Sequence, residues 1–357
     1  VPVAFDEAGL QLGNNIGEAG SFGEAKLATF QGQEVVYKGL KTPADIALNA
    51  SGKSLARGME VTASYLDGKS IPGIAKPTHF IVDETKADGS TQKHVVRSGS
   101  PFRAWATRQL GPASDGGNAA TSLKVSGLIM ARAAGSELDD VTTLDSDKLS
   151  AIRDKGLDTL IGLSKSGFVH GDIKGRNLMY DDASGALNFI DTGGIAKVSN
   201  KSSEKTQDTM FRLTVNPLTL AYAHPGHLSN AEGALGFEQD LFSFGLTLLV
   251  ATLKASSDPV EQENAVKLVN GMNRFHLQVM RADDAQRAQY LDTIEQQTNK
   301  RDYGETLREP INKARPRAPL DAIADKALAM INLALDQKQP VTDRAAWVEK
   351  LQQLRNT

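Results

Sequence analysis

The chain contains no cysteine. This absence excludes disulfides, zinc thiolate sites and thiol nucleophiles, although it does not fix the compartment. An excess of charge is also missing, because 40 Lys and Arg residues are balanced by 43 Asp and Glu residues, for a net charge of -3. A balanced charge gives no reason to expect nucleic acid or a membrane surface as the main partner.

Long apolar runs are missing too, and no stretch approaches the length that a membrane span requires. No signal peptide is recognised, and a chain that begins with Val1 instead of methionine is expected to be a fragment or a processed form. With 357 residues, of which 40% are hydrophobic, the chain is long enough for a sizeable core. We expect one large or two modest domains.

Polar residues gather most informatively in the stretch VHGDIKGRN at 169–177, followed by FIDTG at 189–193. Asp, Asn and Gly are ordinary turn residues, so a surface turn is the plainest interpretation of either stretch alone. The flanking pattern argues against it, because regular elements lead into and out of both stretches. The expected elements are an apolar helical run over 157–168, strands over 177–180 and 186–190, and a hairpin turn over 181–185.

The polar residues of these two stretches have the spacing that phosphoryl transfer from ATP can use. Asp172 can accept a proton from an attacking hydroxyl, and Lys174 can neutralise charge on the group in flight. Asn177 and Asp191 can hold a divalent metal ion on the phosphates. A hairpin between these two residues would let both face one cleft.

This pattern resembles the catalytic loop and the metal-binding loop of the protein-kinase superfamily. Gly171 replaces the usual arginine and Thr192 the usual phenylalanine. The resemblance implies an α+β, bilobal, protein-kinase-like fold. A small antiparallel β-sheet lobe is then expected over 1–130, and a larger, mostly helical lobe over 131–357.

A glycine-rich stretch near the start resembles the loop with which kinases cover the phosphates of the nucleotide. Glycine lets backbone amides approach phosphates closely. Gly17 lies one residue further out than the usual spacing, which leaves its own role open. The residues assigned to the nucleotide here are Gly17, Gly20, Ser21, Phe22, Gly23 and Ala25.

The next predicted strand, over 34–38, ends in Lys38. Its place after the glycine-rich loop resembles the kinase strand whose lysine binds the α- and β-phosphates and pairs with a helix glutamate. A helix is predicted over 53–66, and Glu60 is the only acid inside it, so Glu60 is the expected partner. Val36 stands where a small residue usually meets the adenine.

Residues 98–122 are rich in Gly, Ser and Ala and are interpreted as an insertion with a short helix over 102–110. The strand predicted over 124–130 then leads to a segment that resembles the kinase hinge.

In that resemblance, Met130 stands behind the adenine as the gatekeeper. The backbone groups of Ala131 and Ala133 would bond the adenine edge, and Glu137 would reach the ribose hydroxyls. Met179 completes the set of residues assigned to the nucleotide.

A polar stretch over 194–216 resembles an activation segment, and 222–226 resembles the motif that closes it. Gly226 replaces the glutamate of that motif, so another anchor is expected there. Asp240 opens an apolar helix over 237–253 and resembles the aspartate that holds the catalytic-loop backbone from beneath.

Helical patterns continue to the end of the chain. Two amphipathic helices over 259–299 are longer than the core fold needs, so a helical insertion is placed at 259–300, and a basic loop follows. The last two helices are predicted over 320–335 and 343–355.

Three functions are compatible with these motifs. The first is a serine/threonine protein kinase that uses ATP with Mg²⁺, or Mn²⁺ in its place, because Lys174 two residues after Asp172 is the serine/threonine form. The second is a small-molecule phosphotransferase, since aminoglycoside and choline kinases also have the sequence His-Gly-Asp in this loop. The third is a pseudokinase scaffold, which the departures at Gly171, Thr192 and Gly226 would suit.

The divergent motifs, absent cysteine and extra helices resemble bacterial kinases that secretion systems deliver into host cells. This resemblance implies a virulence effector that is cytoplasmic or secreted into the host, with serine- or threonine-bearing host proteins as substrates. A host activator is compatible with it, whereas a nucleic-acid partner and a membrane span are not expected.

Overall fold

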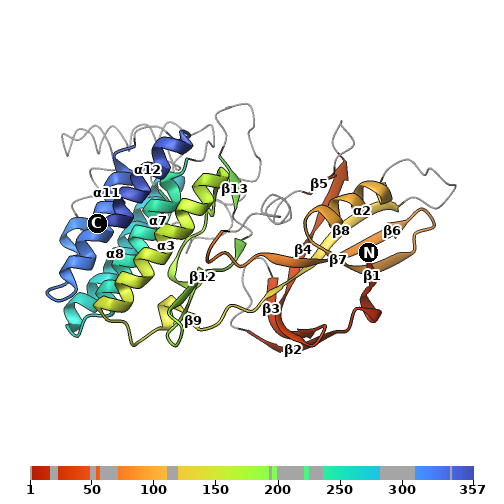
Figure 1. Ribbon diagram of the computed structural model, residues 1–357, viewed down its shortest axis with the longest axis horizontal. Helices are drawn as coiled ribbons and strands as arrows, with labels where there is room; N and C mark the ends of the chain where they lie inside the picture. The colour runs from red at the N-terminus through yellow and green to blue at the C-terminus, as the bar shows by residue number, and fades with distance from the viewer. Residues whose placement is uncertain are drawn as a thin grey trace. The chain divides into compact units, whose positions relative to one another are not determined.

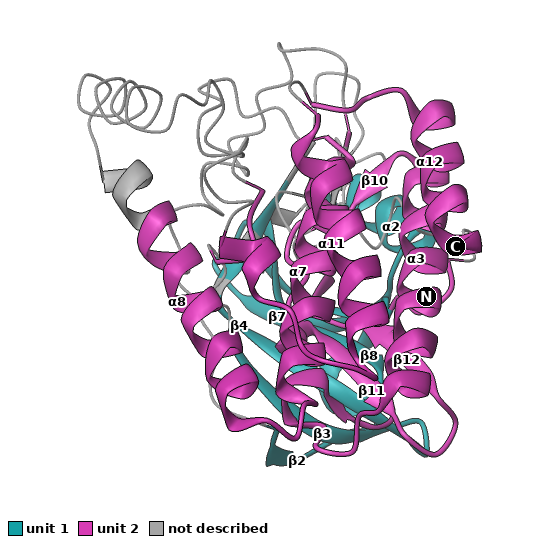
Figure 2. Ribbon diagram, turned by 90° about the vertical axis from the view of Figure 1, so that its left-hand side faces the viewer, with its two compact units in different colours: residues 1–70, 75–133 teal, residues 71–74, 134–357 magenta. Residues whose placement is uncertain are grey.

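The computed structural model shows two compact units, residues 1–70 with 75–133 and residues 71–74 with 134–357 (Figures 1 and 2). The first is built mainly on an antiparallel sheet and the second mainly on helices, as the expected α+β class requires. The structure describes residues 2–16, 23–48, 54–56, 71–110, 120–192, 195–198, 221–224, 236–281, 310–337 and 340–357.

The sheet of the first unit runs in the order β1-β7-β6-β8-β4-β3-β2, and every pairing is antiparallel. Two short turns fix its hairpins. Gln31 and Gly32 both have positive φ, which is typical of the two-residue turn between strands such as β3 and β4. A turn at Asp88 and Gly89 joins β6 to β7. The strands are β1 (Val3–Ala4), β2 (Leu10–Asn15), β3 (Gly23–Phe30), β4 (Gln33–Leu48), β6 (Pro77–Lys86), β7 (Thr91–Arg97) and β8 (Ala120–Ala131).

One expectation for this unit is wrong at its start. The helix predicted over 53–66 does not begin there, because β5 (Ser54–Ala56) is a strand that pairs with the end of β4. The pairing continues the long β4 hairpin, and strand hydrogen bonds override the helical pattern of the sequence. The remainder of that predicted helix, with Glu60, lies outside the described residues.

Helix α2 (Ser100–Leu110) covers one face of the sheet. The sequence predicted a short helix here, within an insertion, and its aromatic side chains turn out to be core residues. Phe102 and Trp105 are buried against Phe80, Val82 and the neighbouring strands, with the Phe80 and Phe102 rings edge to face at 4.9 Å. Burying a side chain of this size contributes roughly 1.5–3 kcal/mol, so α2 is part of what stabilises the sheet.

The second unit is organised around α7 (Glu238–Lys254), whose residues from Glu238 to Leu253 are all buried. A helix that is apolar all round belongs in a core. It packs against α3 (Ser146–Ser166), α8 (Pro259–Arg281) and α11 (Asp321–Leu335), while α12 (Arg344–Asn356) packs on α3 (Figure 1). A Cβ at Gly156 would lie 1.9 Å from the Phe244 ring, so this glycine lets α3 and α7 approach closely.

The ends of α3 follow from its sequence. Asp145 caps its start by accepting a hydrogen bond from the Lys148 amide at 2.8 Å. Gly167 ends it with φ of +81°, in the left-handed conformation that favours glycine at this position. The helix therefore stops directly before β10 (Phe168–Val169) and the polar stretch that follows.

Two small sheets complete the second unit. In one, β12 (Ala186–Phe189), β11 (Leu178–Asp181) and β9 (Ser136–Glu137) lie side by side, and in the other β10 pairs with β13 (Ala196–Lys197). The predicted hairpin strands thus match β11 and β12 to within a residue. In the described part of the chain, every helix is too short or too polar to cross a membrane.

Candidate active site

A buried carboxylate anchors the loop between β10 and β11. Asp240, in the first turn of α7, accepts hydrogen bonds from the backbone amides of His170 at 2.5 Å and Gly171 at 2.9 Å, one to each carboxylate oxygen. Its side chain is buried, so these charge-assisted bonds are little screened by water. The sequence predicted this contact, and it connects the start of the loop to the central helix of the unit.

Three polar side chains of the loop form one hydrogen-bonded cluster. Lys174 Nζ lies 3.1 Å from Asp172 Oδ2 and 3.4 Å from Oδ1. Asn177 Nδ2 donates to the same Oδ2 at 2.9 Å and to the Asp172 carbonyl at 2.8 Å. The Asp172 and Lys174 side chains are only 16% and 15% exposed. The structure therefore brings together three of the predicted site residues and holds the Asp172 carboxylate in one orientation.

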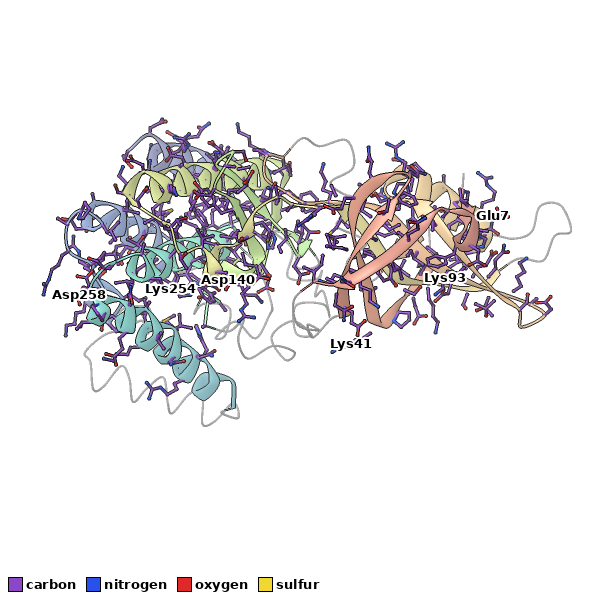
Figure 3. All side chains as sticks on the ribbon, turned by 90° about the horizontal axis from the view of Figure 1, so that it is seen from below. Glu7, Lys41, Lys93, Asp140, Lys254 and Asp258 are labelled. Atoms are coloured by element: carbon purple, nitrogen blue, oxygen red, sulfur yellow. The ribbon has the colours of Figure 1, made fainter. Side chains whose placement is uncertain are left out.

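Two glycines allow the loop to take this path. Gly171 has φ of +79°, a conformation that side-chain-bearing residues rarely adopt, so the arginine of the usual pattern would be strained here. A Cβ at Gly175 would lie 2.5 Å from the carboxyl carbon of Asp139, in the short helix η2 (Leu138–Asp140). Lys254 holds that carboxylate in turn at 2.8 Å, beside η2 (Figure 3).

Asn177 and Asp191 lie at the open end of the β11–β12 hairpin. The Ile190 amide donates to the Asn177 carbonyl at 2.8 Å, which fixes the spacing of the two predicted metal ligands along the backbone. Asp191 has φ of +55°, an uncommon conformation for a residue other than glycine and one that recurs at functional sites. Thr192, which replaces the usual phenylalanine, is buried.

Two residues assigned to the nucleotide are cross-strand neighbours. Glu137 in β9 is the register partner of Met179 in β11. This pairing depends on Gly135, where a Cβ would lie 2.0 Å from the Tyr180 carbonyl oxygen. Burial raises the pKa of Glu137, and the nearby carboxylate of Asp140 raises it further.

The closing motif of the activation segment has an anchor other than the missing glutamate. The His224 amide donates to Gln239 Oε1 at 2.9 Å, and its ring Nε2 lies 3.1 Å from the Ala334 carbonyl. Ser243 Oγ donates to the Tyr222 carbonyl at 2.6 Å. Helices α7 and α11 thus hold 221–224, while Gly226 and most of 194–216 lie outside the described residues.

In the first unit, register places several predicted residues on one face of the sheet. Lys38 in β4 is opposite Ala25 in β3, and Val36 is opposite Met130 in β8. Val36 and Met130 belong to the core that α2 covers, so Lys38 lies on that same face. Ala131 pairs with a β4 residue whose side chain lies on the opposite face of the sheet, and Ala131 itself is exposed.

The remaining predicted residues lie in β3, in the stretch after β8 or outside the described part of the chain. Gly23 approaches β4 closely, since a Cβ there would lie 1.7 Å from the Gly39 carbonyl oxygen. Ala133 lies in the stretch between β8 and β9 without regular structure. Outside the described residues lie Gly17, Gly20, Ser21, Phe22 and Glu60.

Sequence reasoning missed several residues that shape the loop. Asp139 lies against the loop, and Lys254 binds the carboxylate of Asp139. Both come from distant parts of the chain, and no local pattern in the sequence marks them. Gly175 carried a usable signal, because a glycine inside a polar motif often marks a close approach. Gln239 could be suspected only as a neighbour of Asp240.

Comparison with known proteins agrees with this geometry. A family model described as "Protein kinase domain" matches residues 119–335, more than half of the chain. The search of curated proteins returned no match. The chain belongs to the protein kinase domain family, whose members generally transfer phosphate from ATP, with Mg²⁺, to protein substrates.

Proposed function

We propose that this chain is an ATP-dependent serine/threonine protein kinase. The observation that carries the proposal is the Asp172–Lys174–Asn177 cluster on a loop anchored by Asp240. In this proposal, residues 1–130 form the lobe that covers the nucleotide and residues 131–357 the lobe that carries out transfer. The two insertions, at 98–122 and 259–300, have no assigned part in the reaction.

Asp172 is the proposed catalytic base. The closest contacts from Lys174 and Asn177 both go to Oδ2, so we assign Oδ1 as the atom that accepts the proton of the attacking hydroxyl. Fixed neighbours hold this oxygen in place before the substrate arrives, which lowers the cost of reaching the transition state. Lys174 then steadies the negative charge of the phosphoryl group as it moves.

Asn177 and Asp191 are the proposed metal ligands. Asn177 directs its side-chain nitrogen Nδ2 at Asp172, so its side-chain oxygen Oδ1 is the atom available to a cation. A carboxylate and an amide oxygen are hard donors, which suit Mg²⁺ or Mn²⁺ bound together with phosphates and water. A bound Mg²⁺ would neutralise charge on the phosphates.

The nucleotide is assigned to the residues that the resemblance to kinases implies. Lys38 is proposed to bind the α- and β-phosphates and to pair with Glu60, while Glu137 reaches the ribose. The register of Lys38 with Ala25 and of Glu137 with Met179 supports these assignments. The full proposed set is Gly17, Gly20, Ser21, Phe22, Gly23, Ala25, Val36, Lys38, Met130, Ala131, Ala133, Glu137 and Met179.

Serine/threonine specificity rests on Lys174, two residues after Asp172. The second candidate, a small-molecule phosphotransferase, is favoured by one observation, the left-handed Gly171 that gives the loop its His-Gly-Asp form. A pseudokinase is the weaker third candidate, because the polar residues of the catalytic loop remain present and bonded to one another.

The direct experiment is transfer of labelled phosphate from ATP with Mg²⁺, followed by mass spectrometry of the products. Asp172→Ala and Asp191→Ala should abolish transfer to Ser and Thr of a generic protein or of the chain itself. Asp182→Ala, an exposed change in the same hairpin, is the matched control and should keep full activity. Transfer that survives both site changes would overturn the proposal, and transfer only to a small hydroxylated compound would favour the second candidate.

We further propose that the protein is a bacterial effector that acts on host proteins. The support is the resemblance of its divergent motifs to secreted kinases. Incubation with labelled ATP and either host-cell or bacterial lysate tests this. Phosphorylated proteins should appear in the host lysate and require Asp172, whereas labelling confined to the bacterial lysate would contradict the role. If labelling needs the host lysate even for autophosphorylation, a host activator takes part.

A further inference from the structure

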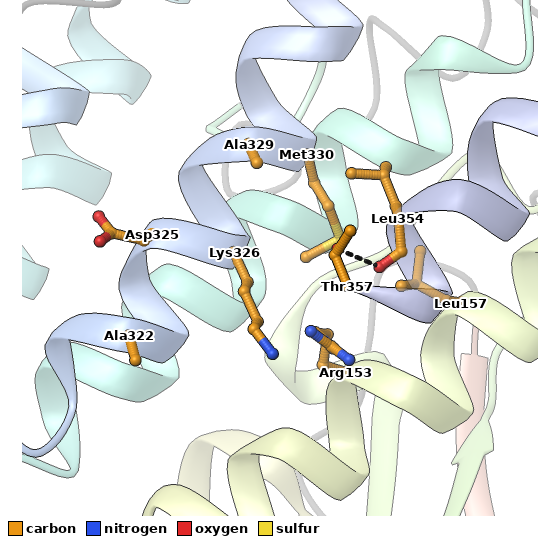
Figure 4. Close-up of a pocket in the computed structure, with 9 residues that line it drawn as sticks. All are labelled: Arg153, Leu157, Ala322, Asp325, Lys326, Ala329, Met330, Leu354 and Thr357. Atoms are coloured by element: carbon orange, nitrogen blue, oxygen red, sulfur yellow. Dashed lines mark hydrogen bonds between the residues drawn. The ribbon is translucent and has the colours of Figure 1, made fainter.

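A cavity of about 300 Å³ lies among α3, α11 and α12, and it has no part in the proposed reaction (Figure 4). Its volume is at the lower end of the range of small-molecule sites, roughly 300–1,000 Å³. Most of its lining is apolar, with Leu157 from α3, Met330 from α11 and Leu354 from α12. Apolar cavities of this kind can bind small hydrophobic molecules.

Two cationic side chains also line this cavity, Arg153 of α3 and Lys326 of α11. Figure 4 shows both extending into the space between the helices, whereas Asp325 points away from them. Asp325 is moreover paired with Arg315. Among the described charged side chains that line the cavity, the two that face it are therefore positive.

Arg153 is an unusual residue to find in such a lining, because its side chain is only 7% exposed. Its Nε donates to Asp154 at 2.8 Å, but Nη1 is buried without a hydrogen-bond partner among the described residues. A buried donor of a charged group that makes no hydrogen bond carries a large desolvation cost. An acceptor within hydrogen-bond distance of Nη1 would remove this cost.

The neighbouring acids are already engaged. Asp154 also accepts from Arg355 at 3.2 Å, and Arg355 reaches Asp158 at 3.1 Å. The two carboxylates thus pair with the two arginines, and Lys326 adds a further positive charge at the cavity. An anionic ligand would complete the charge balance, and the apolar walls would accept its hydrocarbon body.

We propose that this cavity binds a small amphiphilic monocarboxylate, with its carboxylate on the Arg153 guanidinium and Lys326 and its apolar body against Leu157, Met330 and Leu354. The guanidinium retains three N–H groups beyond the two given to Asp154, which suffice for a carboxylate. The site is separate from the proposed catalytic residues, so its occupancy can be tested without any activity measurement.

Octanoate is the probe, with 1-octanol as the uncharged analogue and octylamine as the cationic one. Calorimetric titration of the full chain should show octanoate binding at least tenfold tighter than 1-octanol, and no binding of octylamine. NMR of protein with ¹³C-labelled methionine methyl groups gives a second test, in which the Met330 resonance is identified by its loss in Met330→Leu. On addition of octanoate the Met330 resonance should shift, whereas the Met179 resonance should not. Equal affinity for octanoate and 1-octanol, or a shift at Met179 alone, would overturn the proposal.

Variants test the two cations separately. Arg153→Met and Lys326→Gln should each weaken octanoate binding at least tenfold, and Arg153→Lys should restore part of it. The matched control is Lys267→Gln, an exposed change on α8 that should leave affinity unchanged. Arg153→Met leaves Asp154 paired with Arg355, so circular dichroism should show a folded protein. Unchanged octanoate binding by a folded Arg153→Met variant would contradict the assignment.

Discussion

The two units position their proposed functional residues in different ways. In the helical unit, side-chain hydrogen bonds hold the catalytic loop. Asp240 binds the loop backbone, and Lys174 and Asn177 bind the carboxylate of Asp172. In the sheet unit, backbone register and a packed core place Lys38 and Val36. The comparison teaches that single polar substitutions should damage the first region sharply, whereas the second should respond to loss of packing.

Of the four variants that test this comparison, Asp240→Ala should have the largest effect. It leaves the buried amides of His170 and Gly171 without acceptors and frees the loop to move. A misplacement of about 1 Å costs roughly hundredfold in rate, and loss of two buried hydrogen bonds to a charged group costs about 3–6 kcal/mol. Steady-state kinetics and urea unfolding of the variant measure both. A variant with normal kcat would show that the loop is held by other means.

Trp105→Ala should be comparably destabilising, by about 3–5 kcal/mol, because it removes a large buried side chain from the core beneath α2. The comparison predicts a different kinetic signature from that of Asp240→Ala. At a temperature where the variant remains folded, KM for ATP should rise and kcat should fall little. A selective loss of kcat with an unchanged KM would break the distinction between the two regions.

Glu238→Gln should change how stability depends on pH. Burial raises the pKa of Glu238 to about 7, and the nearby carboxylate of Asp240 also raises it. The hydrogen bond that Glu238 accepts from the Val341 amide at 2.8 Å acts in the opposite direction and lowers this pKa. The folded pKa exceeds the unfolded value, so the stabilisation is complete below about pH 4.5 and is lost as the pH rises through about 7. The loss is about 3 kcal/mol.

Denaturant unfolding between pH 4 and 8 measures this dependence. The wild type should lose stability over that window, and Glu238→Gln should flatten this part of the profile. Equal profiles for both proteins would mean that folding leaves the pKa of Glu238 unchanged.

Gly175→Ala should have the smallest effect of the four, about 1–3 kcal/mol from overpacking. The new Cβ meets the carboxylate of Asp139, which Lys254 holds in place. We expect a fall in melting temperature and in kcat, partly relieved when Asp139→Ala is added. Failure of the double variant to recover either quantity would show that the close approach of Gly175 and Asp139 does not cause the loss.

The sequence predicted the parts of the fold that depend on local pattern. The β11–β12 hairpin matches its turn and strand signals, and Asp240 contacts the loop backbone as its motif implies. The core role of α2 was not predicted, because Phe102 and Trp105 stand in a stretch whose composition resembles a surface insertion. The pairing of β5 with β4 is a tertiary contact that overrides a helical pattern.

The contacts of the candidate site also differ in whether a local sequence pattern predicts them. Asp172, Lys174 and Asn177 lie within six consecutive residues of one loop, so spacing alone predicts that they meet. The approach of Asp139 to Gly175 and the anchoring of His224 by Gln239 join distant segments, and single-sequence patterns carry no signal for such contacts. The same holds for the cationic cavity, which three helices form together.

The central claim is that Asp172 works as a base within a cluster that the loop holds in place. The most direct test is the rate of phosphate transfer from ATP by wild type and by Asp172→Asn, measured together with ATP affinity. The substitution preserves shape, so ATP should bind as before while transfer falls about 10²- to 10⁴-fold. Transfer by Asp172→Asn at the wild-type rate would contradict the account.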